Sequence, residues 1–548
     1  MKFKSIWDAP LFLSVTSAAL LSVASSAESA STMSTQSSTT ESVTTAPAIT
    51  KAVSTDAVDT ATLLKKINEL KTQVNQLVYK QKKAEDKFEN ITQVEDAKIG
   101  VLQASQVSKF PEGYFAIPGT NSAILLGGRI KADAAYYPGN SADSRDASFD
   151  ATFIPLKNYD PVATKSGVTS FSAAYSRLEA KSITNTSAGD ITGWIQIDFH
   201  GNTSSTSSTS YTPRLRHAIV EWNGWTIGQT LTNFQDSDSE PNTLDNDGLV
   251  STLRRLTVRY TAKFDGGFFS FGAERPNTIY TTYAGGTNDN AANGKYGMPD
   301  LTARLRFENK KSWISFRAIA RKLEVNVLPG DLIGGSSASS TVLYANSAFA
   351  SKRTGWGLGT SFKLMTNELS HLYGQANFGS GINDFLTYES LPAAYLQVPI
   401  KSSSTSPLPS GYVGGNATSA ARFTTSRFDL SKGFSAVLGY EWWWNEKFRT
   451  NVAGSVAYLK HSSYAPIGAG SPVSALYTTG PQVNSKLKKF LVNALYSPIK
   501  SVTLGVEVIY GTRETIGGSD ITSSGSKVNY AGGFGKSTQI IGSFIYKF

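Results

Sequence analysis

The sequence predicts an all-β protein: a 16-stranded antiparallel transmembrane β-barrel preceded by a short N-terminal coiled-coil helix. Three observations support this fold class. From Ser122 onward, apolar and polar residues alternate with a period of two, the pattern of strands with one apolar and one polar face. Several of these runs reach 11 residues or more, long enough for a tilted strand to cross a bilayer. The links between the runs alternate between short and long, which is typical of outer-membrane barrels.

The composition excludes several other classes of protein. Only 17% of the 548 residues are charged, below the roughly 25% of average globular chains. The chain contains no Cys, which excludes disulfides, Cys-ligated zinc, iron–sulfur clusters and Cys nucleophiles. After the amino terminus, no stretch offers the ~20 apolar residues that a spanning helix needs. Lys and Arg number 52 against 42 Asp and Glu, so the formal net charge is +10.

Residues 1–27 are predicted to be a secretory signal peptide. Lys2 and Lys4 precede an apolar run at 11–23, and small residues end the segment at Ala27. A membrane anchor is the alternative, although the run is short for a span. Residues 28–57 are mostly Ser, Thr and Ala, which cannot bury a core, and they are predicted to form a linker.

A coiled-coil helix is predicted over 58–97, followed by a second linker over 98–121. Apolar residues recur there at alternating steps of four and three, which is the seam of a coiled coil. An isolated helix would leave this stripe in water, so we expect it to pair with copies of itself. The alternative is a helix packed on its own domain, and the heptads alone do not separate a dimer from a trimer. The seam consists of Leu63, Ile67, Leu70, Val74, Leu77, Gln81, Ala84, Phe88 and Ile91.

The barrel domain is predicted over 122–548. Short links such as Asn223-Gly224 and Asp265-Gly266 follow the even-numbered strands and suit hairpins, whereas long polar links follow the odd-numbered ones. An even number of strands places both barrel ends, and the helix, on the periplasmic side. The strands are predicted at 122–137, 171–183, 190–200, 212–222, 225–234, 253–264, 267–275, 300–308, 312–323, 355–365, 368–378, 432–444, 447–460, 486–497, 501–513 and 536–548.

The last strand supports the same fold. Ile540, Gly542, Phe544, Tyr546 and Phe548 share one face, and the chain stops at an aromatic residue, as in strands that bacterial barrel-assembly machinery reads. Backbone groups cannot stay unpaired in lipid, so the sheet must close on itself. Sixteen strands would leave an aqueous lumen rather than a filled core.

Several stretches resemble the DcaP-like outer-membrane porins. The resemblance implies a 16-stranded barrel, which the strand count reaches separately, and a homotrimer, which the heptads do not establish. It also implies uptake of dicarboxylic acids. The loops depart from the family, above all 379–431, so the substrate is its least transferable implication. The similar stretches are 115–137, 175–180 (YSRLEA), 213–248 (beginning PRLRH), 254–261 (RRLTVRYT) and 493–514.

Basic residues on the polar faces of the strands are predicted to line the lumen and attract anions. A charge on the lipid face costs roughly 2–4 kcal/mol at mid-bilayer, so these residues should face water. Arg binds carboxylates through a fixed fork, and a wall of one charge sign concentrates the counter-ion. The predicted pore-lining residues are Arg129, Lys131, Arg177, Arg214, Arg216, Arg255, Arg259, Arg304 and Arg306, with Lys181 and Arg321 on the same faces.

The resemblance favours five of them, because Arg177, Arg214, Arg216, Arg255 and Arg259 stand in its motifs. For any single residue the alternative is an ion pair that only stabilises the wall, with Glu179, Asp198 or Glu274 as the partner.

The loop after the fifth strand, 235–250, is predicted to fold inward and narrow the pore. Its carboxylates would face the arginines and create a transverse field. One alternative is a calcium site, although the spacing matches no EF-hand. The other alternative is a solvated external loop. The acidic residues are Asp236, Asp238, Glu240, Asp245 and Asp247.

Enzymatic activity, cofactors and nucleic-acid binding are not expected. The four His, at 200, 217, 371 and 461, fall in different hairpins, and no HExxH, GxSxG or Walker sequence occurs. The positive net charge could attract nucleic acid, but the aromatics are placed as interfacial girdles rather than stacking platforms. Trp442, Trp443 and Trp444 beside Asn445 are predicted to belong to the periplasmic girdle.

Together these features predict an outer-membrane porin of a Gram-negative cell, surrounded by outer-membrane lipid. It would pass small anionic solutes, di- or tricarboxylates, down their gradient. One alternative is a general diffusion porin of weak selectivity. The other is a structural or adhesive barrel whose long loops bind a partner.

Overall fold

The structure, a computed structural model, describes most of the chain from Thr60 onward. The predicted signal peptide and first linker, 1–27 and 28–57, lie outside the described residues. Those residues are 60–107, 110–140, 147–157, 167–201, 211–246, 248–249, 253–276, 280–282, 287–288, 294–295, 297–334, 343–345, 347–386, 391, 393–398, 400–402, 426–461, 483–521, 527–530 and 532–548.

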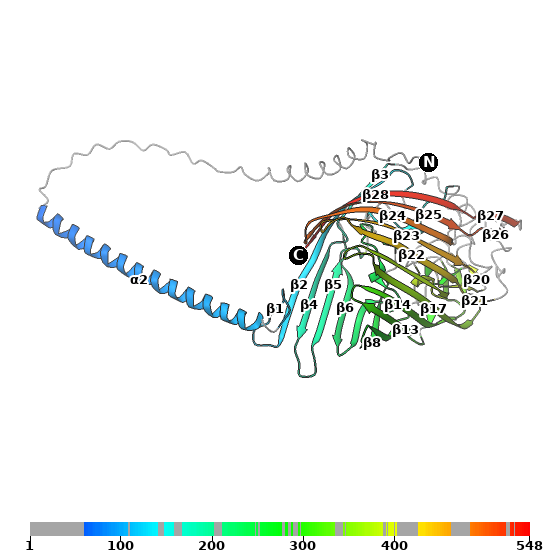
Figure 1. The fold of residues 1–548 in the computed structure, drawn as a ribbon, viewed down its shortest axis with the longest axis horizontal. Helices are drawn as coiled ribbons and strands as arrows, with labels where there is room; N and C mark the ends of the chain where they lie inside the picture. Colours follow the sequence, from blue (N-terminus) through cyan, green and yellow to red (C-terminus); the bar gives the residue numbers. More distant parts are fainter. Residues whose placement is uncertain are drawn as a thin grey trace. The chain divides into compact units, whose positions relative to one another are not determined.

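Sixteen strands in the described part of the chain close into one antiparallel barrel, as the sequence predicts (Figure 1). The first strand, β2, pairs along one edge with the last, β28, and along the other with β3 and β4, which form one interrupted strand. Closure removes every sheet edge from lipid. The strands are β2 (Ser122–Tyr137), β3 (Val168–Ser172) with β4 (Arg177–Thr184), β5 (Ile191–Asp198), β6 (Arg214–Trp222), β7 (Trp225–Leu231), β8 (Arg254–Phe264), β9 (Gly267–Glu274), β13 (Asp300–Asn309), β14 (Ser312–Val327), β17 (Phe349–Met365), β18 (His371–Ser380), β22 (Lys432–Trp443), β23 (Phe448–Lys460), β24 (Asn484–Ile499), β25 (Val502–Thr515) and β28 (Phe534–Lys547).

The links alternate between short turns and long loops. At the β6–β7 turn, Asn223 and Gly224 have φ values of 46° and 83°, the left-handed conformation that a two-residue hairpin of this type requires. Most strand ends lie within a few residues of the prediction. β14 and β17 extend well beyond it, because their pairing continues to Val327 opposite Phe349 at the long-loop end.

Outward and inward residues alternate along the strands. On β2, Ile130 is 51% exposed whereas the next residue, Lys131, is 2% exposed. The same alternation corrects the tryptophan prediction. Trp442 and Trp444 are exposed and stack with ring centroids 4.8 Å apart, but Trp443 faces inward and its Nε1 donates to Glu441 at 2.5 Å. Three consecutive strand residues cannot share a face.

Three long loops fold into the barrel and fill part of its interior. Phe149 from the first, Leu244 from the second and Phe385 from the third belong to one buried cluster with inward strand residues. Small strand residues make room for them: a Cβ on Gly511 of β25 would lie 2.5 Å from the Phe149 ring. Short 3₁₀ helices mark the loops, η1 (Ala151–Phe153), η3 (Ser237–Ser239) and η4 (Asn383–Phe385).

Short strands lie outside the barrel wall or extend it. They are β1 (Phe115–Ala116), β10 (Tyr280–Thr282), β11 (Thr287–Asn288), β12 (Gly294–Lys295), β15 (Leu332–Gly334), β16 (Leu343–Ala345), β19 (Ala394–Gln397), β20 (Ile400–Ser402), β21 (Arg427–Leu430), β26 (Gly518–Ile521) and β27 (Lys527–Tyr530).

One long helix, α2 (Thr60–Val107), precedes the barrel in the described part of the chain (Figure 1). It continues past the predicted 58–97 into the segment expected to be a linker. That segment contains no proline, and the first helix-breaking proline after it is Pro111. The seam residues Ile67, Leu70 and Leu77 are exposed. Among the described residues, no helix is both long enough and apolar enough to cross a membrane.

Candidate functional site

The loop between β7 and β8 crosses the inside of the barrel. The backbone oxygen of Phe234 accepts from Arg317 of β14 at 2.6 Å. Further along, the Nδ2 of Asn242 donates to Glu441 of β22 at 2.5 Å. The loop then reaches β2, where the backbone oxygen of Leu244 accepts from the Lys131 ammonium. These strands belong to different parts of the wall, so this loop spans the interior. Its described residues, 232–246, 248, 249 and 253, are here called the inner loop.

At its first end, carboxylates of the inner loop neutralise two arginines of β13. Asp236 lies 2.5 Å from Arg304 and accepts from the Ser361 hydroxyl at 2.7 Å. Asp238 lies 2.6 Å from Arg306. Burial alone would raise the pKa of the Asp236 carboxyl, but Arg304 and Arg317 outweigh that effect and hold the pKa below its usual value.

The middle of the inner loop is tied to a row of polar residues on adjacent strands. Asn451 and Asn493 donate to the backbone oxygen of Asn242, at 3.3 and 2.7 Å. Glu507 of β25 accepts from the backbone N–H groups of residues 244 and 245, both at 3.0 Å, and from the Thr243 hydroxyl at 2.6 Å. One buried carboxylate thus satisfies three loop donors, as buried polar groups require.

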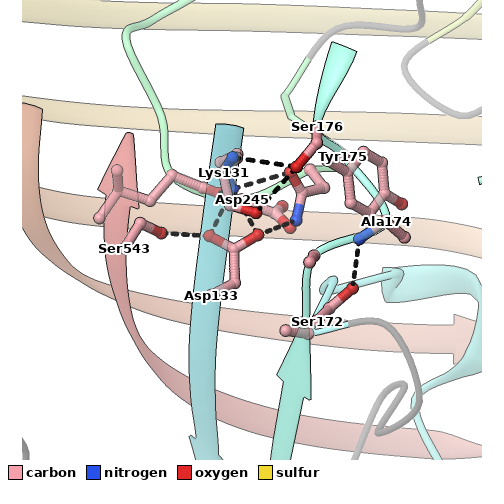
Figure 2. Close-up of polar contacts among 12 residues, drawn as sticks. Lys131, Asp133, Ser172, Ala174, Tyr175, Ser176, Asp245 and Ser543 are labelled. Carbon is pink, nitrogen blue, oxygen red and sulfur yellow. Dashed lines mark hydrogen bonds and ion pairs between the residues drawn. The ribbon is translucent and has the colours of Figure 1, made fainter. Parts of the chain in front are cut away.

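The far end of the inner loop meets two lysines. The Lys131 ammonium bonds both oxygens of Asp133 at 2.7 Å and the Asn246 side chain at 2.8 Å. Figure 2 shows Lys131 and Asp133 on β2, with Ser543 of β28 donating to Asp133 and Asp245 from the loop close by. Asp245 pairs with Lys489 of β24 at 2.6 Å, with both side chains fully buried.

A second infolded loop, which follows β18, neutralises two more arginines. Asp384 lies 2.7 Å from Arg321 and 3.3 Å from Arg255. The Arg255 and Arg321 guanidinium carbons lie 5.3 and 4.8 Å from the Phe385 ring centroid, close enough for cation–π attraction. The loop is joined to the inner loop, since Gln235 donates to the Phe385 backbone oxygen at 3.1 Å.

The opposite stretch of wall, β2 with β4, β5 and β6, carries a row of charged cross-strand neighbours. Arg129 lies opposite Arg177, Arg177 opposite Asp198, and Asp198 opposite Arg214. Asp198 is fully buried and binds the Arg214 guanidinium through two bonds of 2.9 and 2.7 Å. Arg216 also reaches Asp198, at 2.5 Å. The one carboxylate of the row is therefore shared by two arginines.

Arg129 and Arg177 face each other, and neither forms an ion pair with a described residue, although Asp198 is the other cross-strand neighbour of Arg177. The Nε of Arg129 donates to the Tyr175 backbone oxygen at 3.3 Å, and the Nε of Arg177 is buried without a partner in the described chain. Directly opposed like charges destabilise a sheet. Arg259 of β8 also shows no ion pair with any described residue; its neighbours in register are Thr226 and Gly272. Arg129, Arg177 and Arg259 are called the open arginines.

The predicted pore-lining residues therefore separate into two groups. One group forms ion pairs with carboxylates of the barrel or its infolded loops, and the open arginines form none with any described residue. The paired residues are Lys131, Arg214, Arg216, Arg255, Arg304 and Arg306. Lys181 lies 3.6 Å from Glu179. Asp236, Asp238 and Asp245 each contact a different cation. Asp247 lies outside the described residues.

The alternatives for the acidic loop can now be compared with its geometry. Asp236 and Asp245 are 1% and 5% exposed, which does not fit a loop extended into solvent. Within the described ranges, no three side chains of His, Asp or Glu come together as a metal site. Glu240 accepts no hydrogen bond from the described chain. Burial, with the nearby Asp245 charge acting in the same direction, raises its pKa to about 7.

Four residues of the site were not identified from the sequence. Glu507 and Arg317 alternate with apolar neighbours and could have been found by strand parity. Lys489 is harder, because Lys488 precedes it and parity alone does not choose between them. Asp384 lies in a long loop, where no periodic signal exists.

Comparisons with known proteins agree with the barrel. The sequence model described as "DcaP outer membrane protein" matches residues 47–389 and 412–535. The crystal structure of the outer membrane channel DcaP of Acinetobacter baumannii is similar, with 18% identity and a TM-score of 0.52, over 79% of this chain and 99% of that one.

Two further solved structures are more distant. The anion-selective porin from Comamonas acidovorans has 14% identity and a TM-score of 0.40, over 78% of this chain and 100% of that one. OmpT of Vibrio cholerae has 8% identity and a TM-score of 0.42, over 79% and 100%. None of the curated protein sequences matches significantly.

Proposed function

The chain belongs to the DcaP outer membrane protein family, and on that basis we propose that it is a passive channel for small anionic solutes, with di- and tricarboxylates as the preferred class. The chain is a β-barrel of the outer membrane with a porin fold. The proposal concerns what the channel selects.

One observation carries the proposal: the infolded loops neutralise only part of the wall. Their carboxylates contact Arg255, Arg304, Arg306 and Lys489, whereas the open arginines form no ion pair with a described residue. Fixed positive charge in a pore with low-dielectric walls concentrates anions. The open arginines are therefore the proposed anion-selective wall.

The geometry of the charged row favours carboxylates with more than one acidic group. Arg129 and Arg177 are direct cross-strand neighbours, so two guanidinium forks are offered side by side. Each fork can bind one carboxylate through two hydrogen bonds. A dicarboxylate could engage both, and it would relieve the repulsion between the two cations.

The inner loop is proposed to set the width of the pore. It carries Asp236, Asp238, Glu240 and Asp245 across the interior, and its ties to Glu507 and Lys489 hold it in place. The carboxylates and the open arginines would then produce a field across the pore, which orients solutes that carry a dipole.

Self-association is proposed through α2. Its exposed seam residues, among them Ile67, Val74 and Leu77, would be buried in a coiled coil of identical helices. The family resemblance favours a homotrimer. An even number of strands would place this coiled coil in the periplasm.

Solute uptake into proteoliposomes tests the proposal. A four-carbon dicarboxylate should enter faster than a neutral sugar of similar size. Arg129→Gln with Arg177→Gln should slow the dicarboxylate but not the sugar, while Lys263→Gln, an exposed residue at the short-turn end of β8, should change neither. Equal rates for both solutes would indicate a general diffusion pore, and no flux of either would indicate a structural barrel.

A further inference from the structure

The outward face of the barrel carries a group of lysines at the long-loop end of adjacent strands. β22, β23, β24, β25 and β28 follow one another along the wall (Figure 1). Strand parity puts four exposed lysines of these strands on the face that meets lipid, which also carries exposed aromatic residues such as Phe434 and Tyr458. They are called the outward lysines: Lys432, Lys460, Lys488 and Lys536.

The position of these lysines along the strands places them at the border of the apolar band. Lys432 stands ten residues from Trp442 on β22, and Lys536 stands ten residues from Tyr546 on β28. Trp442 and Tyr546 are exposed aromatic residues near the short-turn end. Ten strand residues span about 33 Å, and a tilt of roughly 40° reduces this length to a height of about 25 Å. Because the apolar band of an outer-membrane barrel is also about 25 Å tall, the outward lysines lie at the level of the lipid headgroups.

The described chain does not neutralise this charge. Lys432 and Lys460 are direct cross-strand neighbours, and like charges in that position destabilise a sheet. The ammonium groups of the outward lysines form no ion pair with a described residue. By contrast, Lys486 on the same face of β24 pairs with Glu514 of β25 at 3.4 Å. The outward lysines therefore form a positive surface that an anion from outside the barrel would stabilise.

The spacing of the outward lysines suits a headgroup with more than one phosphate. Lys488 and Lys536 lie opposite Thr512, one on each side of it, which places their backbones about 10 Å apart across the sheet. Lys carries a compact charge on a flexible stem and binds phosphate as a point charge. Two such stems can reach one phosphate, or two phosphates of one headgroup.

We propose that the outward lysines bind the phosphate groups of glycolipids in the outer leaflet of the outer membrane. The long loops of outer-membrane barrels lie outside the cell, so the outward lysines face that leaflet. The acyl chains of the bound lipid pack below the lysines on exposed apolar residues such as Phe434 and Leu438. This surface meets lipid and not the lumen, so the inference goes beyond the proposed anion channel.

Native mass spectrometry of the purified, detergent-solubilised full chain tests the surface with two probes, diphosphorylated lipid A and its monophosphorylated form. The wild type should bind the diphosphorylated probe more tightly. Lys432→Gln with Lys460→Gln should weaken that binding roughly tenfold or more, since each Lys near a charged membrane surface contributes about fivefold. Lys447→Gln with Lys500→Gln removes two exposed lysines at the short-turn end of the same wall and should leave binding unchanged.

Three results would overturn the proposal. The first is equal binding of the two probes by the wild type. The second is an equal loss of binding in Lys432→Gln/Lys460→Gln and in the short-turn control. The third concerns a second copy of this chain as the occupant of this face: Lys432→Gln/Lys460→Gln would then change the number of subunits in the oligomer while lipid A binding stayed at the wild-type level.

Discussion

The ion pair between Lys489 and Asp245 offers the strongest test of how the inner loop is anchored to the barrel wall. Its two atoms lie 2.6 Å apart and both side chains are fully buried. Lys489→Met keeps most of the volume but leaves Asp245 buried without its cation. Breaking a buried pair on one side typically costs about 3–5 kcal/mol. The other oxygen of Asp245 keeps the Phe149 N–H at 2.9 Å, so we expect the lower half of that range.

Urea unfolding of the detergent-solubilised protein, followed by tryptophan fluorescence, measures this loss. Lys488→Met is the matched control, because Lys488 is the adjacent exposed residue, and surface substitutions usually stay within about 0.5 kcal/mol. Adding Asp245→Asn to Lys489→Met should recover more than half of the lost stability, since neither charge of this pair then remains. If Lys489→Met proves as stable as Lys488→Met, the ion pair between Lys489 and Asp245 does not anchor the loop.

Three further outcomes are expected. Glu507→Gln should lower the free energy of unfolding by about 1–3 kcal/mol and raise open-channel current noise. The reason is that an amide side chain cannot accept hydrogen bonds from all three loop donors. Unaltered noise would argue against Glu507 as an anchor of the loop. The pKa of Glu240 near 7 lies above its usual 4.5, so the carboxyl is neutral below about pH 7 and its ionisation above that opposes both folding and anion entry. The anion-to-cation permeability ratio should fall as pH rises from about 6 to about 8, and a flat profile in Glu240→Gln would confirm the source. Leu70→Ser with Leu77→Ser should reduce the oligomer detected by native mass spectrometry, whereas Glu69→Gln should not; an intact oligomer would exclude the helix seam as its cause.

The barrel could be predicted almost completely because neighbouring residues determine its strands and turns. Strand parity places Ile130 outward and Lys131 inward, and the Asn223-Gly224 pair defines a hairpin by its own backbone preference. Lipid requires closure, so a count of strands is enough to give the architecture. The same parity rule excludes a girdle of three consecutive tryptophans, and the prediction is wrong for Trp443, which faces inward.

The division of the arginines could not be predicted. Arg255 and Arg177 have the same sequence signature, a basic residue on the polar face of a strand followed by Leu. Their difference depends on Asp384, which lies 129 residues from Arg255 in the chain and reaches it only because a long loop folds inward. Such contacts depend on tertiary packing, and the alternation of apolar and polar residues does not indicate them.

The most direct test of the central idea, that unneutralised arginines make the channel anion-selective, is its reversal potential in a planar bilayer under a tenfold KCl gradient. We predict a reversal potential with the sign of the chloride equilibrium potential, and a chloride-to-potassium permeability ratio well above one. In the double variant Arg129→Gln/Arg177→Gln this ratio should fall toward one. A wild-type ratio near one, or a potential set by potassium, would contradict the account.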